Sequence, residues 1–163
     1  MSSKKLDQSK HETVASRLGR SPIHLLHRVS QCASDVFVME MGESDLTPRQ
    51  YAVLIAVSLN EGLSQTDLVE LTGVDRSTLA DIVRRMLKKG LLQRRRTKED
   101  ARAYAVKLTE EGWKALRASE PVVKRVDDRL LAVLPPKQRE QFMADLSTIV
   151  EAMNQPENAI KRT

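Results

Sequence analysis

The residues of this sequence that are best suited to chemistry are its lysines and arginines, and they gather in one stretch. Residues 84–107 contain ten Lys or Arg and two acidic residues, a local balance of +8 in a chain whose net charge is +5. The rest of the chain therefore carries about −3. A basic stripe on an otherwise slightly acidic protein is typical of a surface that binds a polyanion such as nucleic acid.

Residue types that support catalysis are sparse. The 163 residues include three histidines and one cysteine, and we find no Gly-rich phosphate loop, no evident pair of catalytic carboxylates and no nucleophile beside a base. We therefore expect neither enzymatic activity nor a cofactor. His24 and His27 have the i, i+3 spacing of a metal pair, but no carboxylate or thiol partner is evident nearby, so we expect no metal site.

The remaining composition points to an ordinary compact protein. The single cysteine, Cys32, excludes an intrachain disulfide and a cysteine-cluster metal site. No apolar run approaches the length of a membrane span, and the N-terminus lacks the apolar core of a signal peptide. The length suits one domain with a sizeable core. We expect a cytoplasmic protein.

The basic stretch begins on a segment, residues 75–90, that has the pattern of an amphipathic helix. Asp75 can cap its first turn, and Gly90 can close it in a left-handed conformation. The apolar stripe is Leu79, Ile82, Val83, Met86 and Leu87. The opposite face carries Ser77, Asp81, Arg84, Arg85 and Lys88. Short polar groups followed by cations suit a helix that enters the DNA major groove, whereas the alternative is a solvated surface helix.

The flanking segments favour the DNA-binding alternative. Ser64 and Asp67 form a predicted capping box for a short helix that ends at Gly73, and two helices joined by a short turn indicate a helix-turn-helix. Residues 91–96 and 101–108, separated by a polar tip at 97–100, predict a two-stranded hairpin with a basic rim. The predicted fold class is mainly α with a small β-hairpin wing, a winged helix-turn-helix.

Five segments of the chain resemble, in order, motifs of the MarR family of regulators. The segments are Leu46–Gln50, Gly73–Thr78, Lys89–Leu92, Asp100–Arg102 and Leu108–Gly112, and the resemblance covers roughly residues 20–153. The family consists of dimeric winged helix-turn-helix proteins. Its wing often reads Asp-Arg-Arg, and the resemblance implies that Arg102 reaches the minor groove while Asp100 orients it. Ala101 replaces one arginine, a loss for which Arg94, Arg95 and Arg96 are available to compensate.

Together, the helical face and the resemblance predict a DNA-binding surface on double-stranded DNA. The residues expected to contact DNA are Ser64, Gln65, Thr66, Arg76, Ser77, Thr78, Asp81, Arg84, Arg85, Lys88, Arg94, Arg95, Lys98, Asp100 and Arg102. We expect Arg94, Arg95 and Lys98 to neutralise phosphates mainly, and the polar residues and arginines of residues 75–90 to reach base edges.

The terminal helices hold more apolar surface than this lobe can cover. We expect a flexible arm at 1–20, a dimerisation helix at 21–45, the DNA-binding region at 46–108, and further dimerisation helices with a tail at 109–163. Thr47 and Gln50 form a capping box for a helix that Gly62 ends, and Pro121 should kink or interrupt the helix after the hairpin. Exposed apolar stripes favour aggregation, so the ends of two chains should interlock in a homodimer.

A dimer of this kind leaves a cleft between its helices and each DNA-binding lobe. We expect the cleft residues to be His24, His27, Arg28, Cys32, Tyr51 and Leu54. The resemblance implies a repressor released from a pseudo-palindromic operator by a small organic anion, an aromatic carboxylate or its coenzyme A thioester, as in members tied to aromatic catabolism. The alternative is an oxidant sensor that uses Cys32, although its apolar neighbours predict a buried, inert cysteine.

Overall fold

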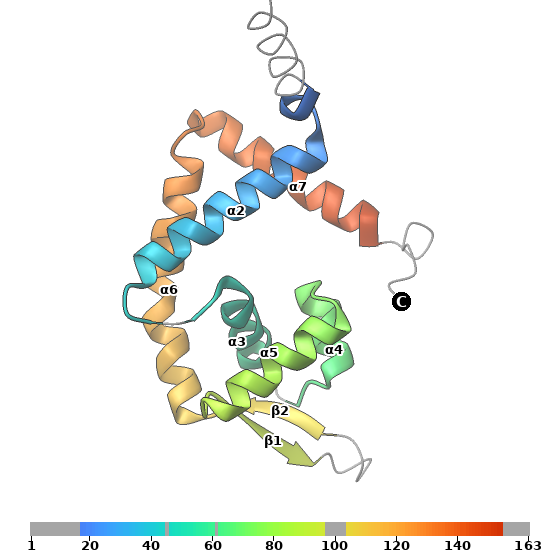
Figure 1. Cartoon of the computed structure of the whole chain (residues 1–163), viewed down its shortest axis with the longest axis vertical. Coiled ribbons are helices and arrows are strands. Elements are labelled where there is room, and N and C mark those ends of the chain that lie inside the picture. The colour runs from blue at the N-terminus through green and yellow to red at the C-terminus, as the bar shows by residue number, and fades with distance from the viewer. Residues whose placement is uncertain (1–16, 45, 61, 97–103, 155–163) are drawn as a thin grey trace, which may run out of the picture.

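The computed structural model describes residues 17–44, 46–60, 62–96 and 104–154. After a short helical segment at residues 17–19, the named helices and strands follow one another along the chain. They are α2 (Pro22–Met41), α3 (Pro48–Leu59), α4 (Gln65–Thr72), α5 (Arg76–Lys88), β1 (Leu92–Arg96), β2 (Tyr104–Leu108), α6 (Glu110–Leu131) and α7 (Pro136–Asn154). Helices α3, α4 and α5 and the hairpin form one lobe, and α6 runs from it to α7 (Figure 1).

The hairpin confirms the predicted wing. Strands β1 and β2 are antiparallel, with Leu92 opposite Leu108 and Arg95 opposite Ala105. The Val106 amide also donates to the Leu63 carbonyl at 3.1 Å, which ties the wing to the segment before α4. The wing is therefore anchored to the helices at its base.

The core of the lobe is the apolar stripe of α5 packed on α3. Leu79, Val83 and Met86 of α5 have at most 1% of their surface exposed, and Val53 and Leu54 of α3 have none. Residues of β1, β2 and α6 complete the same cluster. Burying the stripe fixes which face of α5 is left for solvent.

Helix α3 begins as predicted but ends earlier. The Thr47 hydroxyl accepts from the Gln50 amide at 3.3 Å, and the Gln50 side chain accepts from the Thr47 amide at 3.0 Å, so the capping box is formed. The helix ends at Leu59, with Asn60 as the capping residue, and not at Gly62 as we had predicted. Asn60 leaves the helical region with ψ of 103°, and its side chain donates to the Ala56 carbonyl at 3.3 Å.

Helix α6 is continuous through Pro121, so the predicted interruption is wrong. A proline in a helix removes one N–H donor and crowds the preceding turn. Pro121 is exposed, so the carbonyl that loses its partner can be hydrated. The flanking turns are also supported by side chains: the Ser119 hydroxyl donates to the Ala115 carbonyl at 2.9 Å and an Arg125 nitrogen donates to the Pro121 carbonyl at 3.2 Å.

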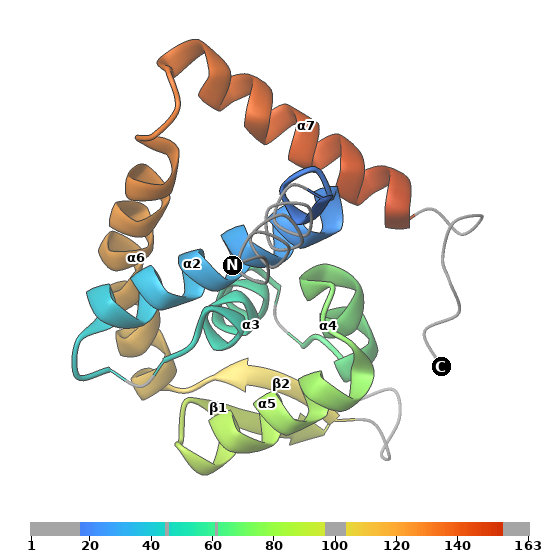
Figure 2. The same ribbon diagram turned by 45° about the horizontal axis from the view of Figure 1, so that its top comes forward.

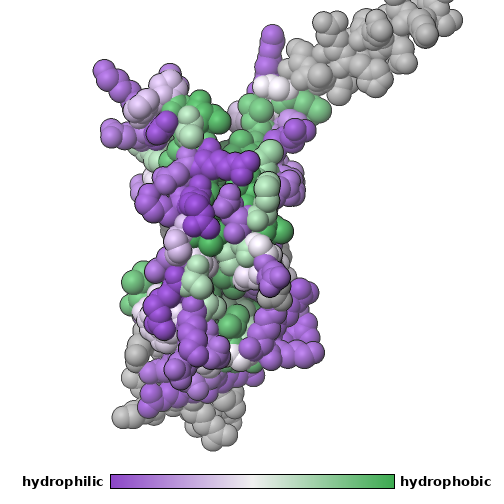
Figure 3. All heavy atoms as spheres, turned by 90° about the vertical axis from the view of Figure 1, so that its left-hand side faces the viewer, coloured by the Kyte–Doolittle hydropathy of each residue, from purple (hydrophilic) through white to green (hydrophobic). Residues whose placement is uncertain are grey.

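The terminal helices leave apolar side chains uncovered. Helix α2 lies across α6, whereas α7 stands away from the lobe (Figure 2). None of the described residues of α7 is buried in the single chain. Apolar side chains come to the surface near these helices, at the top of Figure 3. The larger exposed ones on α2 and α7 are Ile23, Leu25, Leu26, Val29, Val38, Met39, Phe142, Met143, Ile149, Val150 and Met153.

Candidate nucleic-acid interface

The start of α5 is held by its capping residue. The Asp75 carboxylate accepts from the Thr78 amide at 2.9 Å and from the Ser77 hydroxyl at 2.7 Å. These hydrogen bonds, from Thr78 first and then from Ser77, hold the pKa of Asp75 well below its usual range. The carboxylate therefore stays ionised at the positive end of the helix dipole. The predicted cap at Asp75 is confirmed, and it fixes where the outer face of α5 begins.

The outer face of α5 is polar and basic. Arg76, Ser77, Arg84, Arg85 and Lys88 are all exposed, whereas Thr78 is half-buried. The inner face of α5 is in the core, so these cations lie on the face that is left to solvent. This face of α5, the second helix of the helix-turn-helix, has the geometry of a recognition helix.

Asp81 lies between the two arginines of this face. One carboxylate oxygen pairs with the guanidinium of Arg84, and the other lies 2.8 Å from Arg85. The hydrogen bond from Arg84 is the largest cause that lowers the pKa of Asp81, and the charge of Arg85 adds to it. The side chains of Arg84 and Arg85 are still 76% and 67% exposed, so both can reach a ligand on this face.

Helix α4 confirms its predicted capping box. The Ser64 hydroxyl accepts from the Asp67 amide at 3.2 Å, and the Asp67 carboxylate accepts from the Ser64 amide at 2.8 Å. The pKa of Asp67 is lowered, chiefly by its side-chain hydrogen bond with Ser64. Thr66 is exposed, while Ser64 and Gln65 are half-buried, so part of the first turn of α4 is accessible to solvent.

The wing contributes cations on β1. Arg94 and Arg95 are exposed on this strand. Three further predicted contacts, Lys98, Asp100 and Arg102, lie outside the described residues. The basic rim that the sequence predicted is thus present on β1 beside the recognition helix.

The residues predicted to bind a small ligand do not all reach solvent. His24 is half-buried, whereas His27, Arg28 and Cys32 of α2 are exposed; the last of these was predicted to be buried. The prediction placed Cys32 among neighbours that would cover it, but this face of α2 has no covering element in the single chain. Leu54 has no exposed surface because it belongs to the core, so it does not line a cleft.

Tyr51 faces α6. Burial raises the pKa of Tyr51, and the charges of Glu120 and Asp127 raise it further. The pKa of Asp127 is itself raised, first by burial and then by the neighbouring charge of Asp128. A phenol kept neutral here can act as a hydrogen-bond donor. Two hollows of about 590 and 350 Å³ elsewhere on the lobe are not lined by the predicted ligand residues.

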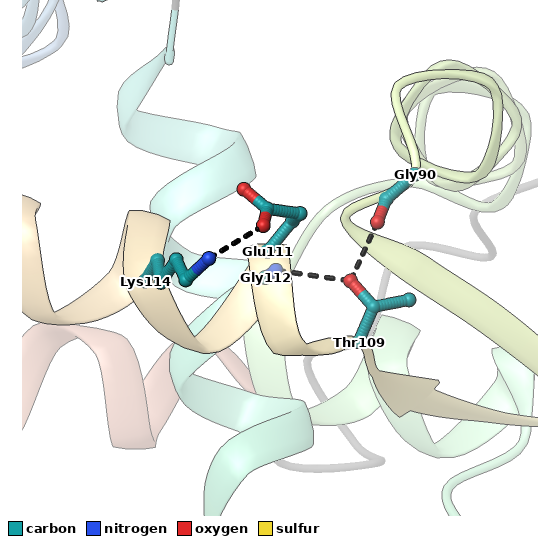
Figure 4. A network of polar contacts seen from close by, with 5 residues as sticks. All are labelled: Gly90, Thr109, Glu111, Gly112 and Lys114. Carbon is teal, nitrogen blue, oxygen red and sulfur yellow. Dashed lines mark hydrogen bonds and ion pairs between the residues drawn. The ribbon is translucent and has the colours of Figure 1, made fainter.

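Two contacts between elements far apart in the sequence were not predicted. The Thr109 hydroxyl donates to the Gly90 carbonyl at 2.5 Å, and this links the end of α5 to the start of α6 (Figure 4). The Glu40 carboxylate of α2 lies 3.2 Å from Arg125 and 3.5 Å from Arg129 of α6. The capping signal of Thr109 was visible in the sequence, but its partner 19 residues earlier was not.

In the described part of the chain, three or more His, Cys, Asp or Glu side chains nowhere gather in an arrangement that could hold a metal ion. Within the same residues, no helix combines the length and the apolar composition needed to cross a membrane.

A helix-turn-helix followed by a hairpin, with a basic outer face on its second helix, defines a winged helix-turn-helix DNA-binding protein. The model of the MarR family matches residues 44–103. The transcriptional regulator HosA of Escherichia coli O127:H6 is 38% identical over 99 residues, which cover 61% of this chain and 73% of that protein. The chain belongs to the MarR family, and it is a transcriptional regulator of this class.

Two solved structures extend the similarity beyond the DNA-binding lobe. The PcaV regulator of Streptomyces coelicolor, in complex with its natural ligand, is 31% identical with a TM-score of 0.78, over 84% of this chain and 96% of that one. Bordetella bronchiseptica BpsR, whose DNA binding is regulated by 6-hydroxynicotinic acid, is 25% identical with a TM-score of 0.76, over 80% and 94%. Both alignments cover most of the two chains, so the fold as a whole is shared.

Proposed function

We propose that the protein is a homodimeric repressor that binds a pseudo-palindromic operator in the cytoplasm and is released by a small organic anion. The observation that carries the proposal is the outer face of α5, on which exposed cations stand opposite a fully packed inner face. A buried inner face holds the helix rigidly, so its outer face can present fixed donors to a groove.

In this proposal the contacts divide into two groups. Arg84 and Arg85 reach base edges from α5, with Ser77 and Thr78 at its start, while Arg94 and Arg95 of the wing neutralise phosphates. The ion pairs of Asp81 with both arginines set their directions before DNA arrives. Residues of the wing tip that lie outside the described part of the chain, Lys98, Asp100 and Arg102, belong to the same proposal.

The proposed dimer rests on the uncovered terminal helices. Val29 of α2 is 50% exposed and Val150 of α7 is 57% exposed, and both belong to apolar stripes that the single chain leaves in water. A second copy covers such stripes most economically, because a two-fold axis lets each chain bury the other's terminal helices. We therefore assign 21–45 and 109–163 to dimerisation and 46–108 to DNA binding.

The proposed effector is an aromatic carboxylate or its coenzyme A thioester. BpsR, a structural relative over most of both chains, has its DNA binding regulated by a hydroxylated aromatic acid. In this chain His27 and Arg28 of α2 are exposed and His24 is half-buried, so they can receive a carboxylate, while Tyr51 offers a neutral phenol. A ligand that binds more tightly to a dimer whose lobes are differently spaced shifts the population toward that form. Fewer dimers can then engage both half-sites at once, so the affinity for DNA falls.

A second candidate function is oxidant sensing on the same fold. The exposure of Cys32 in the single chain favours it, because a sensor cysteine must be accessible. The two proposals share the DNA-binding lobe and differ in the signal that releases it. Peroxide treatment of the wild type and Cys32→Ser distinguishes them.

The DNA-binding proposal is tested by selecting duplexes from a random-sequence library with the full-length protein. We expect the selected duplexes to contain an inverted repeat with half-sites about one helical turn apart, near 34 Å. Sedimentation should give two chains of 18.4 kDa per duplex. Selection of a single unpaired half-site, or one chain per duplex, would contradict the proposal.

A further inference from the structure

The C-terminal end of α5 is closed by a backbone motif. Gly90 has φ of 70°, and its amide donates to the Leu87 carbonyl at 3.0 Å. The Leu91 amide donates to the Met86 carbonyl, also at 3.0 Å. This pair of bonds is a Schellman motif, which glycine adopts without the steric penalty of a side chain. The end of the recognition helix is therefore fixed, and the next two carbonyls along the chain are held in place.

Both of those carbonyls are bonded to one residue at the start of α6. The Thr109 hydroxyl donates to the Gly90 carbonyl at 2.5 Å, and the Thr109 amide donates to the Leu91 carbonyl at 3.1 Å. The same hydroxyl accepts from the Gly112 amide at 3.0 Å, which makes Thr109 the N-cap of α6 (Figure 4). One side chain thus caps α6 and ties it to the end of α5.

The first turn of α6 approaches the backbone of Leu91, just after α5, so closely that a side chain does not fit between them. A Cβ atom on Gly112 would lie 2.1 Å from the Leu91 carbonyl oxygen and 3.1 Å from the Leu108 side chain. The first contact is with backbone, which cannot rotate away as a flexible side chain does. Glycine is required here by the close approach of two chain segments, the first turn of α6 and the segment that follows α5.

The other half of α6 is held by α2. Arg125 and Arg129 pair with the Glu40 carboxylate, and α6 is unbroken between these residues and Thr109. A helix of 22 residues transmits a rotation or translation along its length as one body. A movement in which α2 carries α6 with it would therefore reach the end of α5 through Thr109.

We propose that Thr109 and Gly112 are positioning residues for DNA recognition. With Gly90 and Leu91 they form a joint that fixes the angle of the recognition helix to α6, and so the spacing of the two recognition helices in the dimer. Neither residue needs to touch DNA for this role. The inference rests on the proposed function, because spacing matters only if two half-sites are engaged together.

Substitutions at Thr109 separate the two hydrogen bonds of its hydroxyl. One, from the Gly112 amide, caps α6, and the other, to the Gly90 carbonyl, joins α6 to the end of α5. In Thr109→Asp the carboxylate can accept from Gly112, but it has no hydrogen to donate to Gly90. Thr109→Val loses both bonds without adding charge, and Thr109→Ser keeps both. Thr47→Val is the matched control, because it removes the N-cap of α3 in the same lobe without changing the joint. Gly112→Ala tests the close approach independently.

The measurement is affinity for a series of duplexes derived from the sequence selected by the wild type, with the spacer changed by one or two base pairs. We expect Thr109→Asp, Thr109→Val and Gly112→Ala to lose about tenfold on the wild-type spacer and to shift or flatten the spacer optimum, as substitutions in a coupling element do. Thr109→Ser and Thr47→Val should keep the optimum, and random duplex should bind the four variants of unchanged net charge equally.

The result that would contradict the positioning role differs from the result that would contradict the proposed function. Suppose the wild type prefers one spacer length, and Thr109→Asp, Thr109→Val and Gly112→Ala keep that preference and the same ratio of affinity for selected over random duplex. The positioning role is then wrong, and the proposed function stands. If the wild type itself shows no spacer preference, the dimeric repressor is wrong and the joint has no recognition role. Thr109→Val and Thr47→Val each remove a helix cap, so both should lower the thermal midpoint. Only a change in the preferred spacer length therefore distinguishes a positioning role from a loss of stability.

Discussion

Glu40 near the end of α2 and Arg125 in the second half of α6 lie 85 residues apart in sequence, yet their side chains meet at 3.2 Å. Arg129 approaches the same carboxylate at 3.5 Å. The side chain of Glu40 is 27% exposed and that of Arg125 is 55% exposed, so the pair is partly shielded from water. This contact joins the N-terminal helix to the helix that supports the DNA-binding lobe.

A double-mutant cycle of Glu40→Gln and Arg125→Gln should measure a small coupling energy. For a pair with this exposure we expect about 0.2–1 kcal/mol in the free energy of unfolding, decreasing as salt is added. Lys124→Gln, which breaks a pair with Asp128 within α6, is the control because it leaves α2 untouched. Additive effects of the two substitutions at low salt would show that the contact does not couple the helices.

Arg84 and Arg95 should differ in how they contribute to DNA binding. Arg84→Ala should cost about 1–3 kcal/mol on the selected duplex and much less on random DNA, because a bidentate base contact is sequence-specific. Arg95→Ala should weaken both and reduce the salt slope by about one unit, as the loss of one phosphate contact does. Equal losses for Arg84→Ala on both duplexes would make it a phosphate contact.

The uncovered stripe of α7 gives a direct test of the dimer. Ile149 is 48% exposed in the single chain, and Ile149→Glu should place a charge in the proposed interface. We expect the sedimenting species to shift toward 18.4 kDa at micromolar concentration. Ala144→Glu, on the opposite face of α7, is the matched control and should stay dimeric. The dimer interface lies elsewhere if both variants sediment as the wild type does.

The cap of α5 should make stability depend on acid pH. The folded-state pKa of Asp75 is below the ordinary value of 3.8, so its charge stabilises the folded state above that pH and the contribution is lost as pH falls toward the folded pKa. Asp75→Asn and Asp75→Ser keep a capping oxygen but do not titrate. The thermal midpoint of the wild type minus that of either variant should therefore shrink below about pH 4. A difference that stays constant down to pH 2 would contradict this assignment.

Local signals predicted the DNA-binding lobe well because they act between residues close in sequence. The caps at Asp75, Ser64 and Thr47 are each confirmed, and each is a bond to an amide three residues later. The stripe of α5 followed from helical periodicity alone. Hydrogen bonds between residues three positions apart, and the periodicity of a helix, can be predicted from the sequence without knowledge of the fold.

Predictions that depended on long-range surroundings were less successful. Leu54 was assigned to a cleft but lies in the core, because apolar residues of α3 are surrounded on more sides than one helical pattern reveals. Pro121 was expected to kink or interrupt α6, and the helix is continuous there, with Pro121 exposed and side-chain hydrogen bonds in the turns around it. The hydrogen bond from Thr109 to Gly90 forms only because the hairpin between them brings its two ends together. The residues near either position do not indicate this pairing.

The central claim is that a small organic anion releases the dimer from its operator. The measurement is fluorescence anisotropy of the labelled selected duplex, titrated with 6-hydroxynicotinate, other hydroxylated aromatic acids and benzoyl coenzyme A, with wild type and Cys32→Ser in parallel. We expect one of these anions to lower the DNA affinity of the wild type about a hundredfold, or about 2.7 kcal/mol, and to release Cys32→Ser as well. Release of the wild type alone by peroxide, with no effect of any anion, would contradict the account and identify an oxidant sensor.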